Sequence, residues 1–252
     1  MIDTRGRVAF LTGAAEGLGY DIADELARGG MRLALFDVQA EKLERRAESL
    51  VARGVTAVPY AVDLADGAAT ESAVRRALDE LGPPRVLIHD AAVLRERTLE
   101  EVGIEDWRRE VDVILQAAFI LSKTVWPAMV EASGGSIVFV SSGSALTGFV
   151  KETAYTPAKH GQEGLMKVLA LQGKPVNIAV NTITTGAPID TPMSASHYTE
   201  EMRVGMVSPS RLAPAFGFLA AIDASFASGQ RFNAFQLSEA LTWAVTRPAA
   251  LD

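Results

Sequence analysis

The chain has 252 residues, of which 48% are hydrophobic and 22% charged, and its formal net charge at pH 7 is −7. This composition predicts a globular protein with one large core, so we expect a single domain over residues 1–252. The absence of cysteine excludes disulfides, thiolate nucleophiles and cysteine-ligated zinc, and the three scattered histidines predict no metal site.

The acidic balance and the hydropathy pattern bear on partners and location. Nucleic acids and anionic membranes need clustered lysine and arginine, so we expect neither as a partner. The first residues, MIDTRGR, lack the apolar core of a signal peptide, and the uncharged stretches are shorter than the ~20 residues of a membrane span. The sequence therefore predicts a cytoplasmic protein.

A glycine-rich turn between a strand and a helix is the first motif. The apolar run Arg7–Thr12 predicts a buried strand, Gly13–Gly19 follows it, and a helical pattern then continues through Ile22 and Leu26. Glycines in such a turn let the backbone approach a pyrophosphate, and the helix N-terminus supplies donors and a positive dipole. A tight turn without a ligand has the same pattern, so both interpretations stay open.

The second strand, Leu33–Phe36, ends at Asp37. In a strand-helix-strand unit this is the position of the acid that binds the adenosine ribose hydroxyls. A carboxylate there repels a 2′-phosphate, and Glu16 in the glycine-rich turn adds a second negative charge, so the pair favours NAD over NADP. The alternative, in which Asp37 caps the following helix at residues 39–53, does not exclude this role.

Strands and helices keep alternating along the rest of the chain. We expect further strands at residues 55–62, 85–89, 137–140 and 176–183, and helices at 67–81, 104–132 and from Tyr155 through Leu171. The alternation predicts an α/β fold, a Rossmann-type doubly wound parallel sheet with helices on both faces and ligands at the carboxyl ends of its strands. Asp63, at one such end, can bind the adenine amine or cap the next helix.

The helix at 104–132 is apolar on more than one side and carries Pro127, where we expect a kink or an interruption. One apolar side can face the sheet and the other a second subunit. This pattern predicts a homo-oligomer, either a tetramer or a dimer.

Three polar residues near the fifth strand make chemical sense together. Tyr155 and Lys159 are four residues apart, so on a helix they leave the same face one turn apart. A tyrosine pKa of ~10 is too high for proton transfer at neutral pH, and a nearby ammonium group with an oxidised cationic cofactor would lower it. Ser142 follows a strand and can hydrogen-bond a substrate oxygen. The tyrosine–lysine spacing alone also occurs by chance on solvated helix faces.

These motifs in this order resemble the short-chain dehydrogenase/reductase family. The resemblance covers residues 5 to about 235 and rests on TGAAEGLG at 12–19, Asp37, Asp63, the spacing of Ser142, Tyr155 and Lys159, and IDTPM at 189–193. It implies an NAD(H)-dependent oxidoreductase that passes hydride between a secondary alcohol carbon and the nicotinamide. Tyr155 would be the acid/base, Lys159 would bind the nicotinamide ribose and lower the tyrosine pKa, and Ser142 would hold the substrate oxygen.

The resemblance also implies a set of cofactor-binding positions. They are Gly13, Glu16, Gly17, Leu18, Gly19, Asp37, Asp63, Leu64, Asp90, Ala91, Tyr155, Lys159, Ile189 and Thr191.

The chain departs from the family pattern at several points. His89–Ala92 stands where the family has Asn-Asn-Ala-Gly, and only contacts made through the backbone would survive there. Ile114 replaces an asparagine that belongs to a proton relay in the family, although the backbone carbonyl persists. Thr185–Gly186 replaces a Pro-Gly pair, and residues 229–234 replace a pattern richer in Asp and Gly that concerns the subunit interface.

The segment 194–209 resembles the family's substrate lid. Apolar residues there have spacings that would form one helical face: Tyr198, Met202, Met206 and Val207. Further apolar residues are expected to join them around the substrate: Leu94, Leu146 and Phe149. Together they predict a mainly apolar pocket for a secondary alcohol or ketone, and packing of the lid against the body explains the same residues equally well.

Three functions fit this sequence. An NAD-dependent alcohol dehydrogenase or carbonyl reductase is favoured by the intact Ser142, Tyr155 and Lys159. A low-turnover NAD-binding scaffold or sensor is the alternative that the altered relay suggests. A 3-oxoacyl thioester reductase would normally use NADPH, which conflicts with Glu16 and Asp37.

Overall fold

The computed structural model describes residues 1–197 and 199–246, and a parallel sheet of seven strands forms its centre. The strands are β1 Val8–Thr12, β2 Arg32–Asp37, β3 Ala57–Ala61, β4 Pro84–His89, β5 Gly135–Val140, β6 Ile178–Thr184 and β7 Arg231–Asn233. They lie in the order β3-β2-β1-β4-β5-β6-β7. The order reverses between β1 and β4, and such a reversal opens a ligand crevice at the carboxyl ends of the strands.

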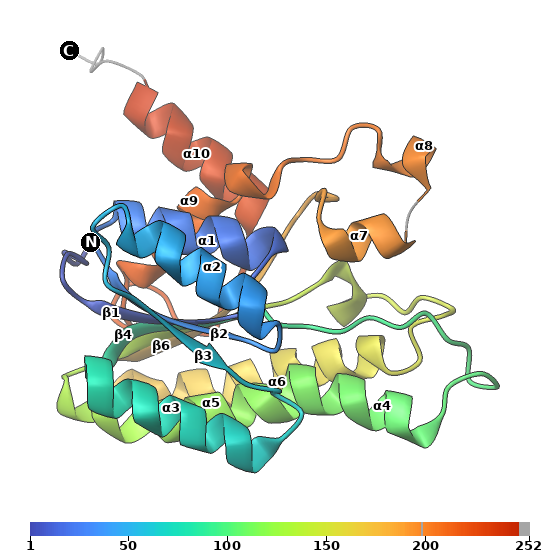
Figure 1. The fold of residues 1–252 in the computed structure, drawn as a ribbon, viewed down its shortest axis with the longest axis horizontal. Coiled ribbons are helices and arrows are strands. Elements are labelled where there is room, and N and C mark those ends of the chain that lie inside the picture. The colour runs from blue at the N-terminus through green and yellow to red at the C-terminus, as the bar shows by residue number, and fades with distance from the viewer. Residues whose placement is uncertain (198, 247–252) are drawn as a thin grey trace.

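Helices cover both faces of the sheet (Figure 1). One layer holds α1 Gly17–Arg28, α2 Ala40–Val51, α9 Ala213–Ala220 and α10 Ala234–Thr246, and the other holds α3 Gly67–Leu81, α4 Ile104–Val111, α5 Ala117–Glu131 and α6 Tyr155–Gly173. This arrangement confirms the predicted doubly wound α/β fold.

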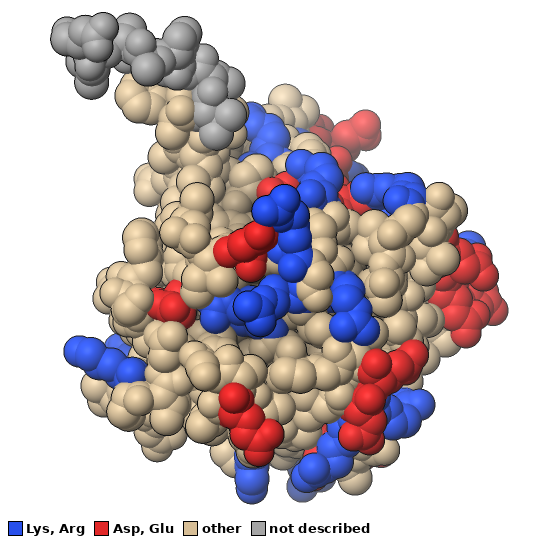
Figure 2. Space-filling view, turned by 90° about the vertical axis from the view of Figure 1, so that its left-hand side faces the viewer, with Lys and Arg blue, Asp and Glu red and all other residues tan. Residues whose placement is uncertain are grey.

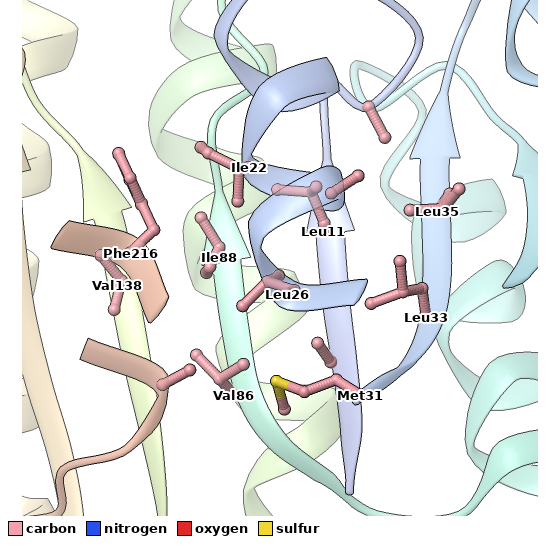
Figure 3. Packing of buried hydrophobic residues seen from close by; sticks show 14 of the residues in the cluster. Leu11, Ile22, Leu26, Met31, Leu33, Leu35, Val86, Ile88, Val138 and Phe216 are labelled. Atoms are coloured by element: carbon pink, nitrogen blue, oxygen red, sulfur yellow. The ribbon is translucent and has the colours of Figure 1, made fainter. Parts of the chain in front are cut away.

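Alternate residues of each strand point to opposite faces, which divides the core into two clusters. Leu11 of β1 and Ile88 of β4 pack against Ile22 and Leu26 of α1, and Phe216 of α9 closes the same cluster (Figure 3). On the other face, apolar residues of the same strands meet α3, α5 and α6. Burying one such side chain contributes about 1.5–3 kcal/mol, and strands apolar on both faces are the pattern expected of a covered parallel sheet.

The helical segment from Ile104 to Glu131 is interrupted, but not where the sequence predicts. A π-helical turn at Asp112–Gln116 separates α4 from α5, whereas Pro127 lies inside α5. A π-turn inserts an extra residue and is often found at functional sites. Pro127 therefore does not interrupt the helix, and the kink expected there as the alternative stays a prediction.

The same segment is long and apolar enough to cross a membrane by length and composition alone, with a mean hydropathy of 1.5 in its most apolar window. In the structure 44% of that window is buried, and Leu121, Val125 and Met129 of α5 belong to the core below the sheet. A core helix of a globular protein meets the same criterion, so hydropathy alone does not distinguish the two.

The predicted lid does not form one helix. It contains α7 Pro192–His197 and the short helix α8 Glu200–Arg203, while Val207 lies beyond both in a β-bridge with Ile189. A single apolar helical face was therefore a wrong prediction. Tyr198 lies outside the described residues, and so does the side chain of Met202.

The two short helices α7 and α8 lie at one end of the molecule (Figure 1). Figure 2 shows the side that lies to the left in Figure 1, away from these helices, where basic and acidic side chains are interspersed among uncharged ones. Mixed charge of this kind is typical of a solvated surface.

Candidate active site

A cavity of about 1320 Å³ lies at the carboxyl ends of the strands. Drug-sized ligands occupy pockets of about 300–1,000 Å³, so this cavity has room for a dinucleotide and a small second molecule. Among the predicted site residues it is lined by Gly13, Glu16, Gly17, Leu18, Asp37, Asp63, Leu64, Asp90, Ala91, Ser142, Tyr155, Lys159, Ile189 and Thr191. Gly19 is not among the residues that line the cavity.

The glycine-rich turn forms the edge of the cavity next to α1. Gly13 and Gly17 have φ values of 72° and 63°, in the left-handed region that favours glycine. A Cβ atom on Gly13 would lie 2.9 Å from the amide nitrogen of Ala91, and one on Gly19 would lie 2.1 Å from the carbonyl oxygen of Gly13. The turn thus leads directly into the N-terminus of α1, whose free N–H groups fit a pyrophosphate.

Asp37 joins the glycine-rich turn to the end of β2. Its Oδ2 accepts a hydrogen bond of 3.0 Å from the amide of Ala15, and its Oδ1 accepts one of 2.9 Å from the amide of Gln39. The carboxylate therefore braces both the turn and the start of α2, and each oxygen keeps a second lone pair. Glu16 is paired with Lys42 of α2, so its charge is partly neutralised, which the sequence did not indicate.

Asp63 lies after β3 and forms an ion pair with Arg109 of α4, while its other oxygen accepts from the amide of Ala65 at 3.0 Å. The cap of α3 is instead Asp66, which accepts from the amide of Ala69 at 2.9 Å. The alternative that Asp63 caps this helix was therefore wrong. Asp63 and Arg109 both face the cavity.

The structure brings Ser142, Tyr155 and Lys159 to the cavity together. Ser142 follows β5 and begins a short 3₁₀ turn, where its Oγ accepts from the amide of Ser144 at 3.1 Å. Tyr155 is the first residue of α6, and the Nζ of Lys159, one turn later, lies 5.5 Å from the centre of the tyrosine ring.

Burial shifts the protonation of this group. It raises the pKa of Tyr155 above its ordinary value, and a hydrogen bond with Ser142 only partly offsets this. Burial also lowers the pKa of Lys159 to about 8, although Asp90 and Glu163 act to raise it. At neutral pH Lys159 is therefore charged and Tyr155 is a neutral phenol.

The turn after β4 holds two titratable residues in unusual states. Burial raises the pKa of Asp90 to about 7, against the lowering effect of Lys159. Burial and the charge of Lys159 lower the pKa of His89 to about 3, so its imidazole is neutral. Both residues occupy positions where the resemblance implied asparagine, and both now interact with Lys159.

A buried cluster beneath Ser142 was missed by the sequence analysis. Arg231 of β7 donates to the carbonyl oxygen of Ser142 at 2.6 Å and forms an ion pair with Glu163 of α6. Glu163 in turn accepts from the hydroxyls of Ser141 and Thr182. The spacing of Lys159 and Glu163 could have placed Glu163 on the same helix face. No local pattern indicates Arg231, since it follows Ser142 by 89 residues.

The substrate end of the cavity is more polar than the sequence predicts. Leu94, Leu146 and Phe149 line it as expected. His197 of α7 also faces it, with its Nδ1 3.8 Å from a carboxylate oxygen of Glu96. This pair connects the predicted lid to the loop after β4.

Known proteins are similar to this chain over most of its length. A family model described as short chain dehydrogenase matches residues 7–202. A cyclohexanol dehydrogenase of Acinetobacter sp. (strain SE19) is 33% identical over 234 residues, which cover 90% of this chain and 92% of that relative. A D-threitol dehydrogenase of Mycolicibacterium smegmatis is 35% identical over 179 residues, which cover 71% of this chain and 69% of that relative.

Solved structures with the same fold include proteins that hold a nicotinamide cofactor. The L-sorbose reductase of Gluconobacter frateurii, in complex with NADPH and L-sorbose, has a TM-score of 0.84 at 26% identity and covers 92% of this chain and 97% of its own. A blue fluorescent protein from a metagenomic library, in complex with NADPH, has a TM-score of 0.84 at 27% identity with the same two coverages.

The raised pKa of Asp90 predicts a pH dependence of stability in the cofactor-free protein. In the unfolded chain this carboxyl has its ordinary pKa of 3.8, whereas in the folded chain its pKa is about 7, so stability falls as pH rises between these values. Asp90→Asn removes the ionisation and should raise the free energy of unfolding at pH 8 by about 2–4 kcal/mol, with no gain near pH 3. Urea unfolding of the wild type and of Asp90→Asn at the two pH values measures this difference in the free energy of unfolding.

The exposed Asp79→Asn serves as the matched control and should change stability little at either pH. A gain for Asp90→Asn that is equal at both pH values would contradict the assignment.

Proposed function

The chain belongs to the short-chain dehydrogenase family, and we propose that it is an NAD-dependent oxidoreductase that interconverts a secondary alcohol and a ketone. The observation that carries the proposal is the meeting of Ser142, Tyr155 and Lys159 in one cavity large enough for a dinucleotide and a small substrate. Relatives named for cyclohexanol and D-threitol support a small alcohol as the substrate.

In the proposed mechanism the bound nicotinamide supplies the hydride acceptor for the alcohol, or the hydride donor for the ketone. The hydroxyl of Ser142 holds the substrate oxygen beside the hydroxyl of Tyr155. Tyr155 takes the proton from the alcohol oxygen during oxidation and returns it during reduction. The Lys159 ammonium favours the phenolate, but the pKa of Tyr155 stays raised with this ammonium in place, so the positive charge of an oxidised nicotinamide would have to supply the further lowering.

Asp37 supports NAD as the cofactor. Its carboxylate is fixed by the amides of Ala15 and Gln39, so it cannot turn away from a ligand that binds along the glycine-rich turn. The free lone pairs can accept from both ribose hydroxyls, whereas a 2′-phosphate would meet a fixed negative charge. Lys42 is engaged by Glu16, which limits its use as a phosphate-binding residue.

A low-turnover NAD-binding protein remains the second candidate, and one observation favours it. The pKa of Tyr155 is raised in the cofactor-free protein even though Lys159 lies beside it, so proton transfer depends on the lowering that a bound cofactor supplies. The proposed enzyme and this scaffold differ in turnover and not in cofactor binding.

We expect Tyr155→Phe to keep the affinity for NADH and to lower kcat by a factor of about 10² to 10⁴, because it removes only the acid/base hydroxyl. NADH fluorescence measures binding, and nicotinamide absorbance with a small secondary alcohol measures turnover. The exposed Tyr20→Phe on α1 is the matched control and should leave both quantities unchanged. Near-wild-type turnover in Tyr155→Phe would remove the tyrosine from the mechanism.

We expect the wild type to bind NAD at least tenfold more tightly than NADP, since one hydrogen bond to a charged group contributes about 1.5–3 kcal/mol. Asp37→Ser combined with Val38→Arg should reduce or invert this preference, and isothermal titration with both cofactors measures it. Asp37→Ser combined with Val51→Arg is the control, because Val38 and Val51 are similarly exposed, at 57% and 55%. Equal binding of both cofactors by the wild type would show that Asp37 does not face the ribose.

We further propose a homo-oligomer, a tetramer or a dimer. Phe119 of α5 is 47% exposed, and Val168 and Leu171 of α6 are 52% and 77% exposed, so two neighbouring helices present apolar side chains to solvent. Association of two subunits through these helices would remove the apolar side chains from water, which favours an oligomer. Sedimentation should show an oligomer at micromolar concentration, and Leu171→Glu should weaken it more than Leu99→Glu, which alters a loop leucine that is 80% exposed. A monomeric wild type would refute the proposal.

A further inference from the structure

The ammonium group of Lys159 is held by two oxygen atoms of the protein. Its Nζ donates to the carbonyl oxygen of Val140 at 2.6 Å and to the Oε1 of Gln162 at 3.5 Å. Lys159 is 2% exposed and Gln162 is fully buried, one turn later on α6. A buried amide beside a buried ammonium group must turn its oxygen towards it, because the NH₂ end of the amide would be repelled by the ammonium.

The other end of the Gln162 amide fixes that orientation. Its Nε2 donates to the carbonyl oxygen of Ile114 at 3.3 Å. Turning the amide over would place two oxygens together at Ile114 and two donors together at Lys159. The side chain therefore has one orientation in which both neighbours are satisfied.

A second donor holds the same carbonyl. The Nε2 of His89 lies 3.1 Å from the oxygen of Ile114, and because that oxygen can only accept, this nitrogen carries the proton. The Nδ1 of His89 then accepts from the hydroxyl of Thr12 at 2.8 Å, and that hydroxyl accepts from the amide of Ala91 at 3.2 Å. In this series of hydrogen bonds, the amide of Ala91, the hydroxyl of Thr12 and the Nε2 of His89 each donate to an acceptor.

The Ile114 oxygen thus lies within hydrogen-bond distance of both His89 and Gln162. The carbonyl lies within the π-helical turn at Asp112–Gln116, which sets its position between α6 and β4. Gln162 therefore contacts both this turn and Lys159 directly.

We propose that Gln162 is a positioning residue that holds the Lys159 ammonium group in place for the cofactor and Tyr155, and that His89 and the carbonyl of Ile114 fix Gln162 in turn. The role of Lys159 in this statement rests on the proposed function. The positioning itself rests on the contacts of Gln162 with Lys159 and Ile114 and can be tested without any turnover.

Other charges also act on Lys159, and the test must separate them from Gln162. Asp90 after β4 and Glu163 on α6 act to raise its pKa, and neutral His89 and Tyr155 lie close by. These groups are unchanged when only residue 162 is substituted. A difference between variants at this position therefore reports the amide itself.

The experiment measures the pKa of Lys159 by NMR of protein labelled at the lysine Cε carbons, with Lys159→Met to assign its signal among the six lysines of the chain. The wild type should titrate near 8. Gln162→Met keeps the bulk of the side chain but removes the acceptor, so the pKa should fall by about one unit, the effect of one hydrogen bond to a charged group. In the same variant kcat should fall while the unfolding midpoint in urea stays close to that of the wild type.

Two further variants complete the test. Gln172→Met, on the exposed face of the same helix, should leave the Lys159 pKa unchanged. Gln162→Glu keeps an oxygen towards Lys159, so its pKa should lie at or above the wild-type value, opposite in direction to Gln162→Met. A Lys159 pKa in Gln162→Met that equals that of Gln172→Met would overturn the proposal.

If Gln162→Met does not fold, Gln162→Glu decides alone, and a Lys159 pKa below the wild-type value in that variant would overturn the proposal. If the wild type oxidises no alcohol while these shifts are observed, the proposed function fails and the positioning role stands.

Discussion

The burial of the Lys159 ammonium group is the constraint on which the rest of the site depends. Lysine is almost never fully buried unless it is paired, because removing the charge from water is costly. Here the cost is offset by the oxygens of Val140 and Gln162 and by the nearby carboxyl groups of Asp90 and Glu163. The pKa still falls to about 8, which leaves the group charged at neutral pH but close to the point of losing its proton.

This requirement explains why charged residues from distant parts of the chain meet below the cavity. Glu163 is itself buried and is paired with Arg231 of β7, which also holds the backbone of Ser142. The same arginine therefore balances a carboxylate near Lys159 and fixes the residue proposed to bind the substrate oxygen. The two side chains of this pair are only 20% and 11% exposed, so removing one partner should be destabilising, and the last strand of the sheet contributes to the site as well as to the fold.

Sequence reasoning placed the fold, the glycine-rich turn, Asp37 and the Tyr155–Lys159 pair, because each depends on spacing within one strand, turn or helix. It failed where the outcome depends on contacts across the sheet, as at Arg231 and at His89, whose partner Thr12 lies on a neighbouring strand. The interruption of the long helix is another case. Pro127 suggested a break near the end of the helix, but the π-turn lies where His89 of β4 and Gln162 of α6 both bond the Ile114 carbonyl. The spacing of apolar residues in the predicted lid likewise did not indicate that this segment would form two short helices, α7 and α8.

The central claim is that these residues catalyse hydride exchange between NAD and a secondary alcohol. The most direct measurement is the absorbance of reduced nicotinamide when the wild-type protein and NAD are mixed with a panel of cyclic and acyclic secondary alcohols, and the reverse reaction with NADH and the matching ketones. The account predicts turnover with at least one such pair. Tight binding of NAD with no turnover of any alcohol or ketone would contradict it and favour a protein that binds the cofactor without using it.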